Sequence, residues 1–169
     1  MTLKTQNLTL RPPTESDLDA IAAMWGDPES GKYMPDPYYT SGEEIKEILE
    51  DDPDCPVYYF VATLHDGDEI IATCSLGMEN AASVTWSIGY NVKKSHRGKG
   101  YAPEMINALI SFARELNLKT LTAPVAQANK ASNRVMEKCG FRISGESSFK
   151  KSGTDIVQPS YVYKKNLFE

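Results

Sequence analysis

The sequence predicts one α+β domain, spanning residues 1–169, with a mixed and mostly antiparallel sheet flanked by helices. Its 169 residues, 41% apolar and 24% charged, suit a single hydrophobic core and exclude a disordered chain. Runs of β-branched and aromatic residues are interspersed with segments of helical periodicity. One strand–helix–strand crossover is expected, late in the chain, so most neighbouring strands should be antiparallel.

Seven strands follow from short apolar or alternating runs that turn residues bound. Pro12-Pro13 ends the first, 65–68 is a hairpin turn after the second, and Glu79-Asn80 turns the chain after the third. The expected strands are 8–11, 58–63, 69–77, 84–92, 121–126, 141–144 and 160–164.

Four helices are expected, at 14–25, 41–51, 100–116 and 131–139. Thr14 or Ser16 can cap the first, and Ser41 with Glu44 forms a capping box for the second. The segment 28–40 carries three prolines and should be an ordered loop.

Charge and cysteine content exclude several classes of function. The net charge of −5 disfavours nucleic acid as a partner, because phosphate backbones are bound by basic surfaces. No apolar run approaches the roughly 20 residues of a membrane span, and the first residues lack a signal-peptide core, so we expect a cytoplasmic protein without a membrane partner. Cys55, Cys74 and Cys139 are widely spaced and should be free thiols rather than metal ligands.

The most informative segment joins the strand 84–92 to the helix 100–116. Four basic residues fall between 93 and 99, and Gly98 and Gly100 allow the backbone to bend and present N–H groups at close range. The following helix adds unpaired N–H groups and the positive end of its dipole. Pro103 has no N–H, so the donors must come from residues 97–102. A phosphate site is the sharper interpretation; a basic turn that only caps the helix is the plainer one.

Two common phosphate-binding motifs are absent from this segment. A P-loop requires G-x-x-x-x-G-K-[ST], which the sequence lacks. A dinucleotide fingerprint requires G-x-G-x-x-G with an acid about 20 residues later, whereas Pro103 occupies the third glycine position and Thr120 the acid position.

A second motif follows the strand 121–126. Asn129 is a suitable N-cap and Gly140 a suitable terminator for the helix between them. Taken alone, this pattern describes a capped helix that packs on the core.

Together, the two motifs resemble the GNAT superfamily of N-acetyltransferases. The turn matches that family's [RQ]-x-x-G-x-[GA] acetyl-CoA motif at Arg97, Gly100 and Ala102. The tripeptides Leu10-Arg11-Pro12 and Ile88-Gly89-Tyr90 look like the branch that includes ribosomal-protein-alanine N-acetyltransferases. The resemblance covers essentially the whole chain.

The resemblance implies a twisted sheet whose central strands splay apart near Val92 and Ala126, with acetyl-CoA between them. It implies that backbone groups near Asn91 and Val92 pair with the pantetheine, that the turn 97–102 holds the pyrophosphate, and that Asn129 contacts the pantetheine arm. Cys74 and Cys139 would be core residues, because in this family the amine attacks the thioester directly. The implied cofactor-binding residues are Asn91, Val92, Arg97, Gly98, Lys99, Gly100, Tyr101, Ala102, Asn129 and Ser132.

The catalytic groups are less complete in this sequence than in similar enzymes. Ser132 lies where this branch resembles enzymes that use a serine near the CoA sulfur, and it is a candidate general acid or only a first-turn helix residue. Met136 replaces a frequent tyrosine and Ser87 a frequent glutamate. Glu146 is a weak candidate base, whereas His65 and His96 are expected in a turn and in the phosphate loop.

The acceptor is expected to be a primary amine. Seven of the twelve residues from 43 to 54 are acidic, which could steer a cationic substrate or form a solvated helix face. Without an evident base, an α-amine of a protein N-terminus or small molecule is favoured, because it is neutral more often than a lysine amine. A polyamine or antibiotic acceptor, a non-catalytic acyl-CoA-binding module and a homodimer remain open. No metal is expected.

Overall fold

The computed structural model describes residues 1–79, 82 and 85–169. Its strands are β1 (Leu3–Lys4), β2 (Leu8–Arg11), β3 (Val57–Leu64), β4 (Ala72–Met78), β5 (Trp86–Val92), β6 (Thr120–Ala126), β7 (Arg142–Lys150) and β8 (Val157–Asn166). Its α-helices are α1 (Leu18–Trp25), α2 (Pro28–Gly31), α3 (Gly42–Ile48), α4 (Tyr101–Glu115) and α5 (Lys130–Lys138). Short 3-10 turns cover Glu15–Asp17 and Lys94–His96.

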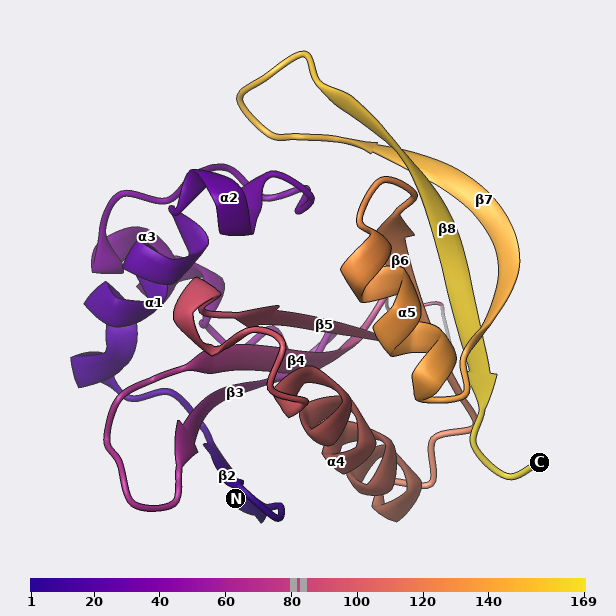
Figure 1. The fold of residues 1–169 in the computed structure, drawn as a ribbon, viewed down its shortest axis with the longest axis horizontal. Helices are drawn as coiled ribbons and strands as arrows, with labels where there is room; N and C mark the ends of the chain where they lie inside the picture. The colour runs from indigo at the N-terminus through magenta and orange to yellow at the C-terminus, as the bar shows by residue number, and fades with distance from the viewer. Residues whose placement is uncertain (80–81, 83–84) are drawn as a thin grey trace.

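The eight strands form one sheet in the order β1-β2-β3-β4-β5-β6-β8-β7 (Figure 1). Among the described residues, β5 and β6 are the only parallel neighbours, and the other pairs are antiparallel. This confirms the expected mixed, mostly antiparallel sheet. The eighth strand is β1, whose two residues are too few to produce a recognisable pattern.

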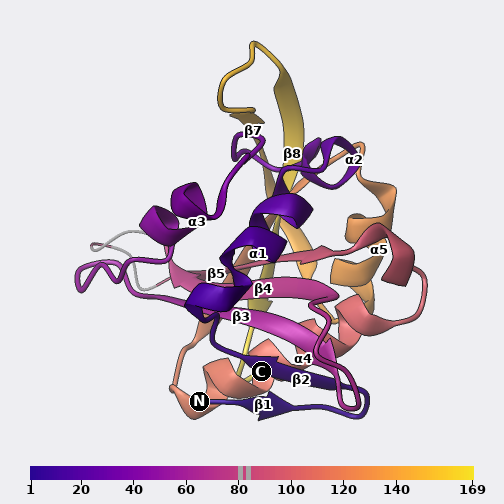
Figure 2. The ribbon, with the colours of Figure 1, turned by 90° about the vertical axis from the view of Figure 1, so that its left-hand side faces the viewer.

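Helices cover both faces of this sheet (Figures 1 and 2). On one face α1 and α3 pack against Val61 of β3 in a small cluster that includes Ile21 and Ile45. On the other face α4 packs against β2 to β6 and contributes Ile106 and Leu109 to the main core. Odd-numbered residues of β5 therefore point toward the α1 side, and even-numbered residues point toward α4.

Several boundaries differ from the sequence-based expectation. The segment expected to be only a loop contains α2, which Asp27 caps by accepting a hydrogen bond from Ser30 N at 3.0 Å. Helix α3 ends at Ile48 rather than near 51, because an acidic run at a helix C-terminus opposes the dipole and Pro53 follows. The expected turn residue Asn80 and strand residue Val84 lie outside the described residues.

The last two strands are the largest correction. β7 continues to Lys150 rather than ending at 144, and β8 spans 157–166 rather than 160–164. Nearly all of β7 is exposed at the sheet edge, so its sequence shows no apolar alternation, and cross-strand pairing alone extends it. The two strands form a long hairpin that rises above the rest of the sheet (Figure 1).

The parallel pair β5–β6 is unusually short. Among the described residues, only Trp86↔Leu121 and Ser87↔Thr122 are paired, whereas β5 has seven pairs with β4, and β6 has seven with β8. Beyond Ser87 the two strands diverge, which confirms the expected splay (Figure 1). Backbone groups that face this gap have no neighbouring strand to pair with.

An ion pair anchors the start of α1 to β2. Arg11 donates two hydrogen bonds to Asp17, at 2.7 and 3.0 Å, and Thr14 N donates to the same carboxylate at 2.7 Å. The Arg11 guanidinium lowers the pKa of Asp17 to about 2, and the buried carboxylate completes the capping box at Thr14.

We therefore predict that Asp17→Asn lowers the free energy of unfolding by about 2 kcal/mol at pH 7, given 1.36 kcal/mol per pKa unit. Because the folded-state pKa is depressed, this stability is present above about pH 4 and is lost as the pH falls toward 2. Urea unfolding from pH 7 to pH 2.5 measures it. Asp66→Asn, in the exposed turn after β3, is the control, and equal losses in both variants would contradict the prediction.

Candidate active site

The gap between β5 and β6 brings the two sequence motifs together. One wall is the end of β5 with the turn that leads into α4, and the other is the end of β6 with the start of α5 (Figure 1). The order of elements is the one that the spacing predicts. The splayed strands and two helix N-termini thus face a common opening.

The turn before α4 has the geometry of an anion site. Gly98 and Gly100 adopt φ angles of 73° and 84°, in the left-handed region that favours glycine. A Cβ built at either position would meet no atom within 4 Å, so there is space beside the backbone. Residues 97–100 are exposed, and the N–H groups of the first turn of α4 have no intrahelical acceptor.

Basic side chains around this turn are used in different ways. Arg97 donates from Nε to Val92 O at 2.9 Å and from a terminal nitrogen to Ser30 Oγ at 2.8 Å, so it holds the turn against β5 and α2. Lys94 pairs with Glu29 at 2.9 Å and Lys93 pairs with Glu69. Lys99 is exposed and belongs to none of the ion pairs in the described part of the chain. The local excess of positive charge is therefore smaller than the sequence suggests.

The start of α5 forms the opposite wall. Asn129 Oδ1 accepts a hydrogen bond from Ser132 N at 3.2 Å, which confirms Asn129 as the N-cap. Buried Asn133 donates to Ala126 O at 3.1 Å and accepts from Tyr163 Oη at 2.8 Å. Sequence reasoning missed Asn133, which fixes α5 against β6 and β8.

A phenol reaches Ser132 from the other wall. Tyr90 Oη, on β5, donates a hydrogen bond to Ser132 Oγ at 2.8 Å. Burial raises the pKa of the Tyr90 phenol, so the hydroxyl stays protonated at neutral pH. The sequence shows no phenol at position 136, where Met136 is buried in the core, but the structure brings one to Ser132 from position 90. No local sequence signal could have predicted this contact between residues 42 positions apart.

On the α1 face, the centre of the sheet is open. Ser75 pairs with Gly89, and Gly77 pairs with Ser87, so these positions share that face. Gly89 is exposed although its strand is central, Pro124 of β6 is exposed, and Ser75 and Ser87 are half-buried. We call Ser75, Ser87, Gly89 and Pro124 the open strip. It consists of small, uncharged residues beside the point where β5 and β6 diverge.

A carboxylate lies at the end of the open strip. Thr122, which pairs with Ser87 at the last rung of the β5–β6 ladder, donates a hydrogen bond from Oγ1 to Glu79. Thr122 alternates with core residues Leu121 and Ala123, so it points to the same face as the open strip. Ser87 stands where related enzymes often carry glutamate, and Glu79, from the end of β4, brings a carboxylate to that neighbourhood.

The other candidate bases lie elsewhere. Glu146 is opposite Tyr161 in the β7–β8 ladder, so it shares the face of Tyr161 and Tyr163, which covers α5 rather than the open strip. His65 bridges Thr9 Oγ1 at 3.0 Å and Thr5 O at 3.0 Å in the turn after β3. His96 lies in the 3-10 turn before α4, with Nδ1 2.9 Å from Ser95 Oγ.

The tip of the β7–β8 hairpin is attached to the end of α2 and to the segment that follows it. Lys151, only 2% exposed, donates from Nζ to the carbonyl oxygens of Gly31 at 2.7 Å, Met34 at 3.2 Å and Asp36. Its ammonium also lies 4.2 Å from the centroid of the Tyr38 ring. These contacts attach the β7–β8 hairpin to α2 and the segment after it, which lie on opposite sides of the splay (Figure 1).

The remaining sequence candidates have structural roles. Glu44 accepts hydrogen bonds from Thr40 N and Ser41 N at the start of α3, and the other acidic side chains between 43 and 54 are exposed. Tyr39 packs on Trp25, with ring centroids 5.8 Å apart. Cys74 and Cys139 are buried, as expected for core residues, and burial raises the pKa of Cys74 to about 12.

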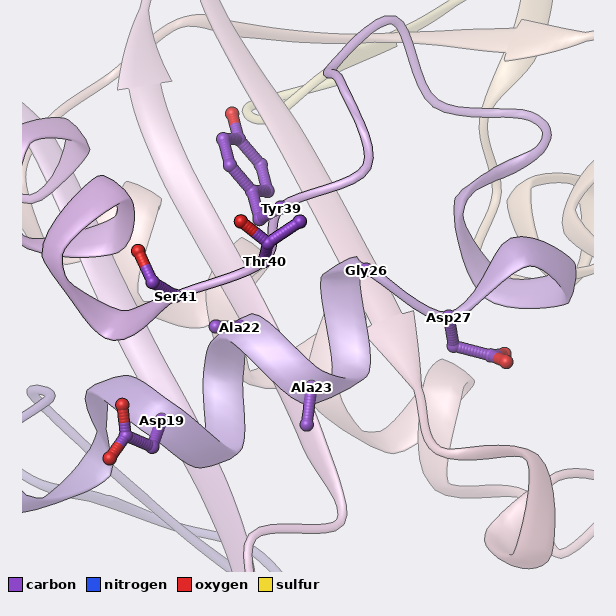
Figure 3. A pocket seen from close by; sticks show the side chains of 8 residues that line it. All are labelled: Asp19, Ala22, Ala23, Gly26, Asp27, Tyr39, Thr40 and Ser41. Carbon is purple, nitrogen blue, oxygen red and sulfur yellow. The ribbon is translucent and has the colours of Figure 1, made fainter.

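A separate groove of about 460 Å³ lies along α1 (Figure 3). Asp19, Ala22 and Ala23 of α1 line it together with residues 39–41. None of the residues of the splay, the glycine turn or the open strip contributes to it. This groove is therefore distinct from the place where the motifs converge.

Comparisons with known proteins identify the family of this chain. A family model described as an acetyltransferase (GNAT) domain matches residues 7–142. The chain belongs to the GNAT family of N-acetyltransferases. It is 30% identical over 149 residues to the N-acetyltransferase p20 of Bacillus licheniformis, covering 85% of this chain and 84% of that protein.

Two solved structures illustrate the shared fold. A spermidine N-acetyltransferase from Vibrio cholerae, in complex with CoA and spermine, has a TM-score of 0.80 at 23% identity and covers 95% of each chain. A ribosomal-protein-S5-alanine acetyltransferase from Vibrio fischeri has a TM-score of 0.76 at 18% identity and covers 100% of this chain and 98% of that one. Enzymes of this family use acetyl-CoA, while these two named acceptors differ, so the fold does not identify the acceptor.

Two further classes of feature are absent from the described part of the chain. None of its helices is both long and apolar enough to cross a bilayer. Within the same residues, no three His, Cys, Asp or Glu side chains gather in a way that could hold a metal ion.

We predict that Gly100→Val weakens CoA binding by more than about tenfold, or 1.4 kcal/mol, because it fills the space beside the turn and strains a left-handed backbone. Calorimetry with CoA measures it. Gly153→Val is the matched control, because Gly153 has φ 76° and the same open surroundings but lies in the β7–β8 hairpin. Equal affinity in Gly100→Val and the parent would exclude the turn from CoA binding.

Proposed function

We propose that this GNAT enzyme transfers the acetyl group of acetyl-CoA to an α-amine, on a protein N-terminus or a small molecule. The observation that carries the proposal is the open strip, whose small, uncharged residues lie beside the splay with the Glu79 carboxylate at one end. The turn 97–102 would bind the pyrophosphate, and the unpaired backbone of β5 near Asn91 and Val92 would bind the pantetheine. Asn129 would contact the pantetheine arm of the cosubstrate.

The chemistry of the open strip favours a single amine over a polyamine. Recognition of a polycation needs several carboxylates at spaced positions, whereas Ser75, Ser87, Gly89 and Pro124 carry no charge. The exposed acids between 43 and 54 do not belong to this strip. They can raise the local concentration of cations, but they supply no ligands on the floor.

The protonation state of the acceptor supports the same choice. An amine attacks a thioester only when neutral, and at pH 7.4 a lysine-type amine of pKa about 10.4 is neutral once in roughly a thousand molecules. An α-amine of pKa about 7.8 is neutral roughly a quarter of the time. A site with no histidine at the open strip is matched to the second kind of amine.

Glu79 would act after the amine has attacked. The attacking nitrogen then carries a surplus proton, which a nearby carboxylate can accept directly or through one water. The hydrogen bond from Thr122 keeps this carboxylate at the vertex of the splay. Glu146 would take no part in this step, because it lies on the other face of the sheet.

We expect kcat/KM to be higher for α-amines than for ε-amines and to rise with pH along the acceptor's own titration. Release of CoA thiol is measured with peptides of free α-amine and blocked lysine, with their reverse, and with spermidine. N-Acetylated peptides are the control for thioester hydrolysis. Preference for spermidine or for lysine side chains would overturn the α-amine assignment.

We expect Glu79→Gln to lower kcat by about 10² fold, the lower end for acid–base groups, with little change in KM for acetyl-CoA. The amide still accepts a hydrogen bond from Thr122, so the local structure should persist. Glu115→Gln, exposed at the end of α4, is the control. A Glu79→Gln variant with parental kcat would exclude this residue as the proton acceptor.

A further inference from the structure

The contact between Tyr90 and Ser132 is the feature of the splay that the proposed function does not yet use. It joins the two walls of the opening through side chains alone, from β5 to the first turn of α5. Tyr90 lies three residues beyond Ser87, the last β5 residue paired with β6. Both hydroxyl groups are therefore within the diverging region.

Serine by itself is a poor acid for a thiolate. Loss of its proton would leave an alkoxide, which is a far stronger base than the thiolate that it protonates. A phenol with a reference pKa near 10 is a much closer match to a thiol near 8.5. A serine in this position can therefore deliver a proton efficiently only if its oxygen gains another one at the same time.

We propose that Tyr90 and Ser132 form a proton relay that protonates the sulfur of departing CoA. The proposal rests on the proposed acetyl transfer and adds a second residue to it. Tyr90 is a positioning and proton-supplying residue that acts through Ser132, and Ser132 is the group that touches the sulfur.

The hydrogen-bond directions fit this relay. Tyr90 Oη donates to Ser132 Oγ, so one lone pair of Oγ is occupied and the hydroxyl hydrogen of Ser132 points elsewhere. In the described part of the chain no side-chain or backbone acceptor is assigned to that hydrogen. Ser132 N is held by Asn129 Oδ1, which fixes the serine at the third position of α5.

The protons and electrons balance in one turnover. When the C–S bond breaks, its electron pair goes to sulfur, which takes the proton of Ser132 Oγ while Oγ takes the proton of Tyr90 Oη. The surplus proton of the acceptor nitrogen passes to Glu79 and to solvent, and solvent returns one proton to Tyr90. The positive end of the α5 dipole favours the developing negative charge on sulfur.

The relay also explains how this chain tolerates Met136. Related enzymes often carry a tyrosine there, on α5, whereas here Met136 is 1% exposed in the core and the phenol comes from β5. Burial of Tyr90 raises its pKa, which keeps the donor protonated over the working pH range.

The test compares Tyr90→Phe, Ser132→Ala and the double variant with any amine that the parent enzyme accepts. We expect each single variant to lower kcat by roughly tenfold to 10² fold, with KM for acetyl-CoA within about twofold. The double variant should be no slower than the slower single variant, because both changes interrupt one path. Tyr58→Phe, whose ring stacks on Trp86 in the core, is the matched control and should keep parental kcat.

A solvent isotope measurement separates proton transfer from packing. The ratio of kcat in H₂O to kcat in D₂O should stay at the parental value in Tyr58→Phe, which keeps the relay. The ratio should change in both Tyr90→Phe and Ser132→Ala. Parental kcat in Tyr90→Phe, or losses that multiply in the double variant, would overturn the relay. A preference for ε-amines would overturn the α-amine proposal alone, because the relay can be tested with either acceptor.

Discussion

The early end of the β5–β6 ladder is the constraint on which the rest of the structure depends. After two paired residues on each strand, β5 and β6 diverge. These central strands therefore expose backbone donors and acceptors that pairing within a sheet normally satisfies. Such groups need partners from outside the strands. Under the proposed function, an extended amide-containing chain such as pantetheine would supply them, and the glycine turn and both helix N-termini face the same gap.

The divergence is held by contacts that cross it or brace its ends. Arg97 fixes the turn to the end of β5, Asn133 fixes α5 to the end of β6, and Tyr90 meets Ser132 between them. At the tip of the β7–β8 hairpin, Lys151 donates hydrogen bonds to the carbonyl groups of Gly31, at the end of α2, and Met34. The opening is thus preorganised, so little ordering is required of its walls when a ligand binds.

Local sequence signals predict the helix bounds, whereas pairing between distant segments determines the length of β7 and the side-chain contacts at the splay. The expected bounds of α4 and α5 agree with the structure to within one residue, because Gly100, Asn129 and Gly140 are strong boundary residues. The length of β7 was missed because an exposed edge strand has no apolar alternation. The contacts of Tyr90 with Ser132 and of Glu79 with Thr122 join residues 42 and 43 positions apart, and composition and spacing do not encode such contacts.

Amide hydrogen exchange with and without CoA tests the central claim that the cosubstrate occupies the splay. Binding should slow exchange at residues 88–92 of β5, at 98–102 and at the start of α5. Exchange in the groove along α1, at residues 19–27 and 39–41, should not change. Protection confined to that groove, or none at 98–102 under saturating CoA, would contradict the account.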